Sequence, residues 1–230
     1  MLGFTLSKLN LLILVTALFG IIAFFLFTLT DMMVARSAQQ MVNDLVETTA
    51  GITTGDAFCK EETVTIPEEI TYFSGRRFYY IMRISREPAK YDPQYLSKLI
   101  FKVAARKEQT KFIATNSYDM NAEILLYQWP VAEITTDLKE QSSIILDPTS
   151  ETTASNSVKL IKEVYYGKNF LHVIACNTDS GQCEINKSYA GCCLEKWRKA
   201  LAEISGLLYV KSSCVPPAEN CENLSCDIRG

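Results

Sequence analysis

Histidine is nearly absent from this chain, and basic residues do not outnumber acidic ones. His172 is the single histidine, which excludes metal sites built from several imidazoles. The formal net charge of -3 makes the protein a poor candidate for nucleic acid, because such binding depends on Lys and Arg neutralising phosphates. The chain also lacks a Gly-rich phosphate loop, a Gly-x-Ser-x-Gly motif and a His-Glu-x-x-His motif. We therefore expect no cofactor, no metal and no catalytic residue, and the protein is not expected to be an enzyme.

Charge is missing altogether from residues 9–30, a run of apolar residues that organises the rest of the chain. About 20 apolar residues cross a bilayer as a helix, so this run predicts a transmembrane segment. A cleaved secretory signal has a shorter apolar core followed by a small-x-small site, whereas Asp31-Met32-Met33-Val34 follows this run. A retained anchor is therefore favoured over a removed signal or a buried hairpin in a complex, and the lipid bilayer is its expected partner.

The orientation of the anchor is predicted from charges and cysteines. Lys8 and the amino terminus precede the run, and positive charge favours the cytoplasmic side. All eight cysteines follow the run, where an oxidising compartment would suit them. We expect a cytoplasmic flank or short leader at 1–8, the transmembrane helix at 9–30, a helix extension at 31–50 and an extracytoplasmic α+β domain at 51–230.

Gly3-Phe4-Thr5-Leu6, directly before the apolar helix, resembles the processing site of type IV pilins and pseudopilins. In that family a leader peptidase cleaves after the glycine, the new N-terminal residue is methylated, and the helix packs into a filament core. The resemblance implies that the mature chain begins at Phe4 and that copies associate through this helix. Lys8 stands where the family usually has glutamate, and it would repel a neighbouring amino terminus rather than neutralise it.

Past residue 30 the helix is expected to continue to about residue 48, because no Gly or Pro interrupts it. The alternative is a separate helix after a kink. One face of the extension is apolar at helical spacing, and it comprises Val34, Ala38, Met41 and Leu45.

The domain reads as a mainly antiparallel sheet with two further helices. Asp92-Pro93 predicts the start of the first helix, with Leu96, Leu99, Ile100 and Val103 as its buried stripe. The second is expected from about Cys192 to Gly206, with a stripe of Leu194, Trp197, Leu201 and Ile204. Strands are predicted at 63–66, 77–84, 111–114, 122–127 and 207–210, and a hairpin at 158–176 that contains His172. The polar run 147–157 is expected to be a surface loop, although it also suits a boundary between two domains.

The eight cysteines predict four disulfides that hold a polar C-terminal tail. Cys176 and Cys183 flank a turn-rich run and are expected to pair. Adjacent Cys192 and Cys193 would join their helix to two segments, one of them the tail and the other near Cys59. Zinc binding is the alternative for one of that adjacent pair with Cys214, Cys221 and Cys226, although the spacings are loose. Thiol exchange by a cysteine at a helix N-terminus is a further alternative to structural disulfides, but no Cys-x-x-Cys motif occurs.

Two sequons, at Asn186 and Asn223, are possible glycosylation sites. Together these features predict a single-pass protein at the cell surface with a structural or interaction role. Its sharper form is a pilin-like filament or assembly subunit. A tethered ligand-binding module that does not polymerise is the alternative. A tethered hydrolase is a third, since numerous carboxylates are available.

Overall fold

The computed structural model describes residues 2–72, 75–88, 97–128, 137–140, 143–150, 155–179, 181–206, 208–219, 221 and 225–227, without the side chains of 2–8 and a few others. The described elements are two helices, α1 (Leu2–Thr53) and α2 (Gln182–Ser205), and twelve strands. The strands are β1 (Cys59–Thr65), β2 (Ile70–Tyr72), β3 (Arg76–Phe78), β4 (Tyr80–Pro88), β5 (Ser97–Ala105), β6 (Glu108–Met120), β7 (Glu123–Gln128), β8 (Asp137–Glu140), β9 (Ser143–Leu146), β10 (Ser157–Tyr165), β11 (Lys168–Cys176) and β12 (Ser225–Asp227).

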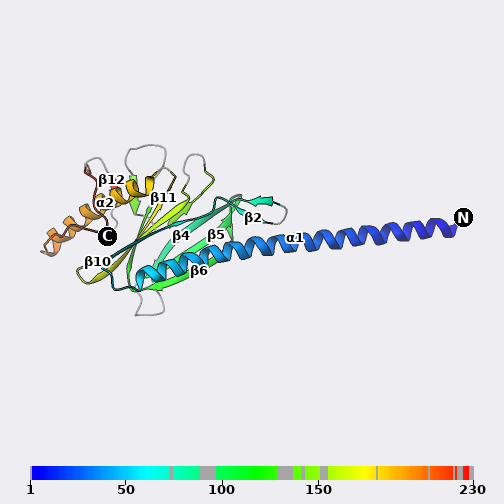
Figure 1. The fold of residues 1–230 in the computed structure, drawn as a ribbon, viewed down its shortest axis with the longest axis horizontal. Helices are drawn as coiled ribbons and strands as arrows, with labels where there is room; N and C mark the ends of the chain where they lie inside the picture. The colour runs from blue at the N-terminus through cyan, green and yellow to red at the C-terminus, as the bar shows by residue number, and fades with distance from the viewer. Residues whose placement is uncertain are drawn as a thin grey trace.

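Helix α1 is a single rod whose N-terminal half projects from the domain (Figure 1). No residue between 31 and 53 breaks it, so the predicted extension is continuous with the apolar run. Its C-terminal half lies on the domain through one buried face at helical spacing, which comprises Val34, Ala38, Val42, Leu45, Thr49 and Ile52. The predicted face is confirmed except that Met41 is only partly buried, and Val42 takes its place in the core.

Two main sheets form the domain. One has six strands in the order β1-β10-β11-β7-β8-β12, and the other has four in the order β6-β5-β4-β9. Strand pairing is antiparallel except for β11 with β7 and β12 with β8. The predicted hairpin is confirmed: β10 and β11 are joined at Tyr165 and Lys168 by the two-residue turn Tyr166-Gly167, where both residues have positive φ.

Buried side chains form two cores, one on each face of the six-stranded sheet. The larger core contains apolar residues of α1, of the four-stranded sheet and of one face of β7, β10 and β11. The smaller core joins the opposite face of these strands to α2 and the tail. Because both faces are covered, β10 is buried along most of its length despite three charged residues, and each of these needs a partner.

Four local predictions are wrong. Residues 97–105 form strand β5 between β4 and β6 rather than a helix; the predicted start at 92–93 lies outside the described residues. The predicted strand 77–84 is interrupted at Tyr79. Helix α2 begins at Gln182, ten residues before the predicted start, although it ends as expected before Gly206 in the left-handed conformation. Residues 208–210 do not form the predicted last strand.

The apolar stripe predicted on α2 is buried only in part. Leu194 is buried and the Trp197 ring packs edge-on against Phe170. Leu201 is 41% exposed and Ile204 is 85% exposed, because the last turns of the helix extend beyond the sheet (Figure 1).

Candidate functional site

The N-terminal half of α1 is the most apolar exposed surface of the described chain. From Leu9 to Met33 its large apolar side chains point outward on all sides, with exposed fractions between 38% and 68%. Within the described residues α1 is the one helix long and apolar enough to cross a membrane, as judged by length and composition. Water would disfavour so much apolar area, so lipid or other helices must cover it.

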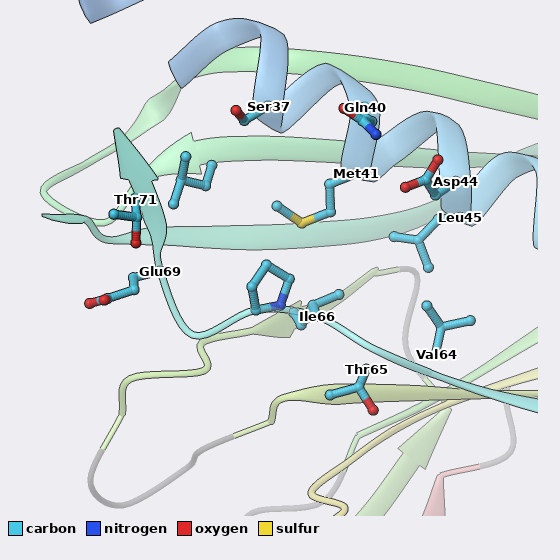
Figure 2. A pocket seen from close by; sticks show the side chains of 12 residues that line it. Ser37, Gln40, Met41, Asp44, Leu45, Val64, Thr65, Ile66, Glu69 and Thr71 are labelled. Carbon is cyan, nitrogen blue, oxygen red and sulfur yellow. The ribbon is translucent and has the colours of Figure 1, made fainter. Parts of the chain in front are cut away.

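A groove lies where α1 first meets the domain. Its volume is about 340 Å³, and its walls are one face of α1 and the segment that joins β1 to β2 (Figure 2). Met41 and Leu45 project from the helix, and Val64 and Ile66 lie on the opposite wall, so the interior is largely apolar. Asp44 and Glu69 lie at its rim, and Glu69 pairs with Arg77 at 3.2 Å. Ser37 is the first residue of α1 that lines the groove. The groove therefore begins roughly 10 Å along the helix from the end of the apolar run.

A second site, made of polar side chains, is buried between the six-stranded sheet and α2. The Glu163 carboxylate accepts two hydrogen bonds from Arg198, at 3.1 and 2.6 Å, and a third from the Ser212 hydroxyl at 2.7 Å. The Arg198 guanidinium lies 3.6 Å from the centre of the Tyr165 ring. Arg198 is 1% exposed and Glu163 is 4% exposed, so this pair joins α2, β10 and the tail inside the protein.

His172 completes the buried cluster. Its Nε2 lies 3.2 Å from the Glu163 carboxylate, and its Nδ1 lies 3.3 Å from the Tyr127 hydroxyl. Burial lowers the pKa of His172 below its ordinary value, which keeps the ring neutral. The neutral ring donates from Nε2 to Glu163 and accepts at Nδ1 from Tyr127.

The charge of Glu163 survives its burial. Burial alone would raise the pKa of this carboxyl, but hydrogen bonds from His172, Arg198 and Ser212 outweigh it and lower the pKa to about 2. His172 is 0% exposed, and Tyr127, Glu163 and Arg198 are buried too, so none of these four side chains can meet a substrate in this structure. The cluster therefore holds β7, β10, β11, α2 and the tail together.

The cysteines form three disulfides within the described residues rather than the four predicted, and Cys59 and Cys214 are free thiols in this structure. The Cys176–Cys183 bond is present as predicted. Cys192 and Cys193 both bond to the tail, through Cys221 and Cys226. The prediction that one of the adjacent pair binds near Cys59 is therefore wrong: consecutive positions on a helix diverge by about 100°, yet the tail reaches both sulfurs.

The alternative readings of the cysteines are corrected by the same bonds. Zinc cannot use Cys221 and Cys226, since both sulfurs are in disulfides. No group of three or more potential ligands lies together in the described part of the chain. The thiol-exchange reading placed Cys192 and Cys193 at a helix N-terminus, but they lie in the middle of α2 and are bonded. The cysteine in the first turn of α2 is Cys183, which is bonded to Cys176.

The sequon at Asn186 is not a usable glycosylation site in the folded protein. This residue is 2% exposed, and its amide nitrogen, the atom that would carry the sugar, donates to the Ala175 carbonyl at 2.9 Å. Asn223 lies outside the described residues. Gly3 and Phe4 fall in the first turns of α1.

No protein-family model, curated protein or solved structure matches this chain. A long apolar helix joined to a disulfide-bonded domain fits a membrane-anchored extracellular protein.

Proposed function

We propose that this protein is a surface assembly subunit whose copies associate through α1, in the manner of a pilin-like protein. The observation that carries the proposal is that one unbroken helix of 52 residues has two different halves. The C-terminal half is part of the domain core, and the N-terminal half exposes apolar side chains on every side.

The two different halves of α1 suit a subunit whose apolar half contacts lipid first and other copies of the protein later. While anchored, the apolar half is covered by acyl chains. In an assembly, neighbouring copies of the same half would cover it instead, and burial of apolar surface favours association by about 25 cal/mol per Å². The domain stays fixed on the rod because residues 38–52 of the helix, about four turns, are part of its core.

Lys8 sets a physical requirement for such an assembly. A positive charge in a packed helical core is costly unless an acidic partner neutralises it. Asp31 and Asp44 are the candidate partners on a neighbouring copy, and they would reach Lys8 only if adjacent subunits are strongly staggered.

The proposal is tested by replacing Gly3. If the resemblance to pilins holds, the mature chain begins at Phe4, and Gly3→Leu blocks both processing and surface assembly. Gly20→Leu is the matched control for processing, since it makes the same change within the apolar run, where an added side chain meets no other group. The readouts are the mass of the mature N-terminus and the amount of protein in sheared surface material.

A tethered binding module is the second candidate, and the groove beside Met41 favours it. Its apolar floor and carboxylate rim suit an extended segment that carries a basic side chain. In cells with an active prepilin peptidase, a mature protein that retains Met1 or Leu2 would make this second candidate the better account.

A further inference from the structure

Cys59 and Cys214 lie together where the C-terminal tail crosses the start of β1. The Cys214 thiol donates to the Phe58 carbonyl at 3.7 Å, so it reaches the peptide bond between Phe58 and Cys59. The same carbonyl accepts from the Val164 amide at 3.0 Å, which fixes it against β10.

The tail is held at this place from its other side as well. Ser212 donates to Glu163 at 2.7 Å, and Glu163 is the residue paired with Cys59 in the β1–β10 ladder. The Val215 amide then donates to the Ser212 hydroxyl at 2.9 Å. The segment 212–215 is thus placed on both sides of Cys214, and the free Cys214 thiol lies close enough to the free Cys59 thiol for the two to interact electrostatically.

We propose that Cys59 and Cys214 form a fourth disulfide, which joins the first strand after the anchor helix to the tail. The other six cysteines are already bonded to one another. Cys214 is buried and Cys59 is exposed at the edge of the sheet, so the two differ in access to solvent.

Because Cys59 is exposed and Cys214 is buried, Cys59 reacts with the oxidant first. The oxidant is the disulfide of a thiol oxidoreductase of the extracytoplasmic compartment. Cys59, as a thiolate, attacks one sulfur of that disulfide, which releases one donor thiolate and leaves a mixed disulfide. The Cys214 sulfur then attacks Cys59 Sγ and displaces the second donor thiolate. The two protons from Cys59 and Cys214 pass to the donor sulfurs, so the donor leaves as a dithiol carrying two electrons.

The contact between the thiols also favours this order. Burial, together with the contact with Cys59, raises the pKa of Cys214 to about 12, so Cys214 is a poor first nucleophile. Once Cys59 is in the mixed disulfide it carries no charge, and its part in raising the pKa of Cys214 disappears.

The bond would close a loop of roughly 150 residues, and cross-links over long loops restrict the unfolded chain most. It would also hold Ser212 against Glu163, so that the tail keeps the buried cluster around Glu163 covered. The tail would then be attached at Cys214 to β1, and at Cys221 and Cys226 to α2.

The experiment is peptide mapping of the full chain after export and extraction with an alkylating reagent present. Digestion with trypsin and a glutamate-specific protease, without reduction, separates Cys214 from Cys221 by cutting after Glu219. The expected product links peptide 48–60 to peptide 212–219, disappears on reduction, and is accompanied by no alkylated cysteine.

Two variants give the same test independently. Cys59→Ser should gain one alkyl group, at Cys214 after denaturation, and Cys214→Ser should gain one at Cys59 in the native protein. The proposal is overturned if the unmodified chain carries an alkyl group on both cysteines while the other three bonds are intact. A Cys59–Cys59 link between copies, or a Cys59→Ser protein that gains no alkyl group, overturns it equally.

Discussion

Arg198 and Glu163 are the residues whose roles are least visible in the sequence. They are 35 positions apart, and a lone Arg on a helix or Glu on a strand ordinarily faces solvent. Their burial follows from the coverage of both faces of the six-stranded sheet, which no local pattern encodes. His172 was predicted within the second strand of the hairpin, where it lies, but its burial and its partners were not predicted.

We expect Arg198→Ala to lower the free energy of unfolding by about 3 kcal/mol or more, because it leaves the Glu163 carboxylate buried without its main partner. Lys199→Ala is the matched control on the same helix. Lys199 is exposed and its pair with Glu195 spans one turn, so its loss should lower the free energy of unfolding far less than the loss of Arg198. Urea unfolding of the two detergent-solubilised variants provides the comparison, and equal losses would contradict a structural role for the buried pair.

The buried cluster should make stability fall on acidification in two stages. The folded pKa of His172 lies below its ordinary 6.5, so the unfolded chain binds a proton first and stability drops as pH falls below about 6.5. The folded pKa of Glu163 is about 2 against an ordinary 4.5, so its contribution is complete above 4.5 and is lost between about 4.5 and 2. Urea unfolding at about pH 7.5, 5.5 and 3.5 measures both stages, and Glu163→Gln should flatten the second. A domain that is most stable at the lowest pH would contradict this account.

At the scale of elements, α1 was identified from its one apolar face and the hairpin from its turn residues, although β10 and β11 are buried on both faces. The hairpin β10–β11, strands β6 and β7, and the domain-facing half of α1 were all predictable. Strand β5 was read as a helix because Leu99, Ile100 and Val103 fit a helical stripe. In fact it carries buried residues on both faces, which leaves no alternation to detect.

The start of α2 was not predicted, because its first turns lack the apolar pattern of a helix. Its first turns bury Cys183, Asn186 and Ala190, which are small or polar and give no hydrophobic stripe. The tail then packs where α2 has a glycine, and that close approach is a tertiary feature. Gly191 faces the backbone of Pro216, and a Cβ there would lie 2.4 Å from the Pro216 carbonyl oxygen.

We therefore expect Gly191→Ala to destabilise the domain by about 1–3 kcal/mol, since the tail backbone must move to admit a methyl group. Gly51→Ala is the matched control in a helix: no atom lies near the added methyl group, and the change should stabilise α1 by about 0.5–1 kcal/mol. The check is thermal unfolding together with the rate at which a protease trims the tail. Shifts of the same sign in both variants would contradict the close packing of tail and helix.

At the scale of the whole molecule, the sequence predicted the architecture better than its details. The charge-free run, the helical extension and the cysteine-rich tail together gave a rod that carries an α+β domain, and the fold has this form (Figure 1). The groove beside Met41 was not foreseen, because it forms between segments that are distant in the sequence. The disulfide partners other than Cys176–Cys183 were likewise not predictable, because the spacing of cysteines does not show which part of the domain the tail packs against.

The central proposal is that residues 9–30 anchor the protein in a membrane with the domain on the outer side. It is tested most directly by labelling intact spheroplasts with an amine reagent that cannot cross the membrane, followed by peptide mapping of the membrane fraction. Lys60, Lys111 and Lys168 are exposed on the domain, whereas Lys8 precedes the span. The account predicts that the three domain lysines are labelled in intact spheroplasts and that Lys8 is labelled only after permeabilisation. Labelling of Lys8 in intact spheroplasts, or protection of the domain lysines until permeabilisation, would contradict it.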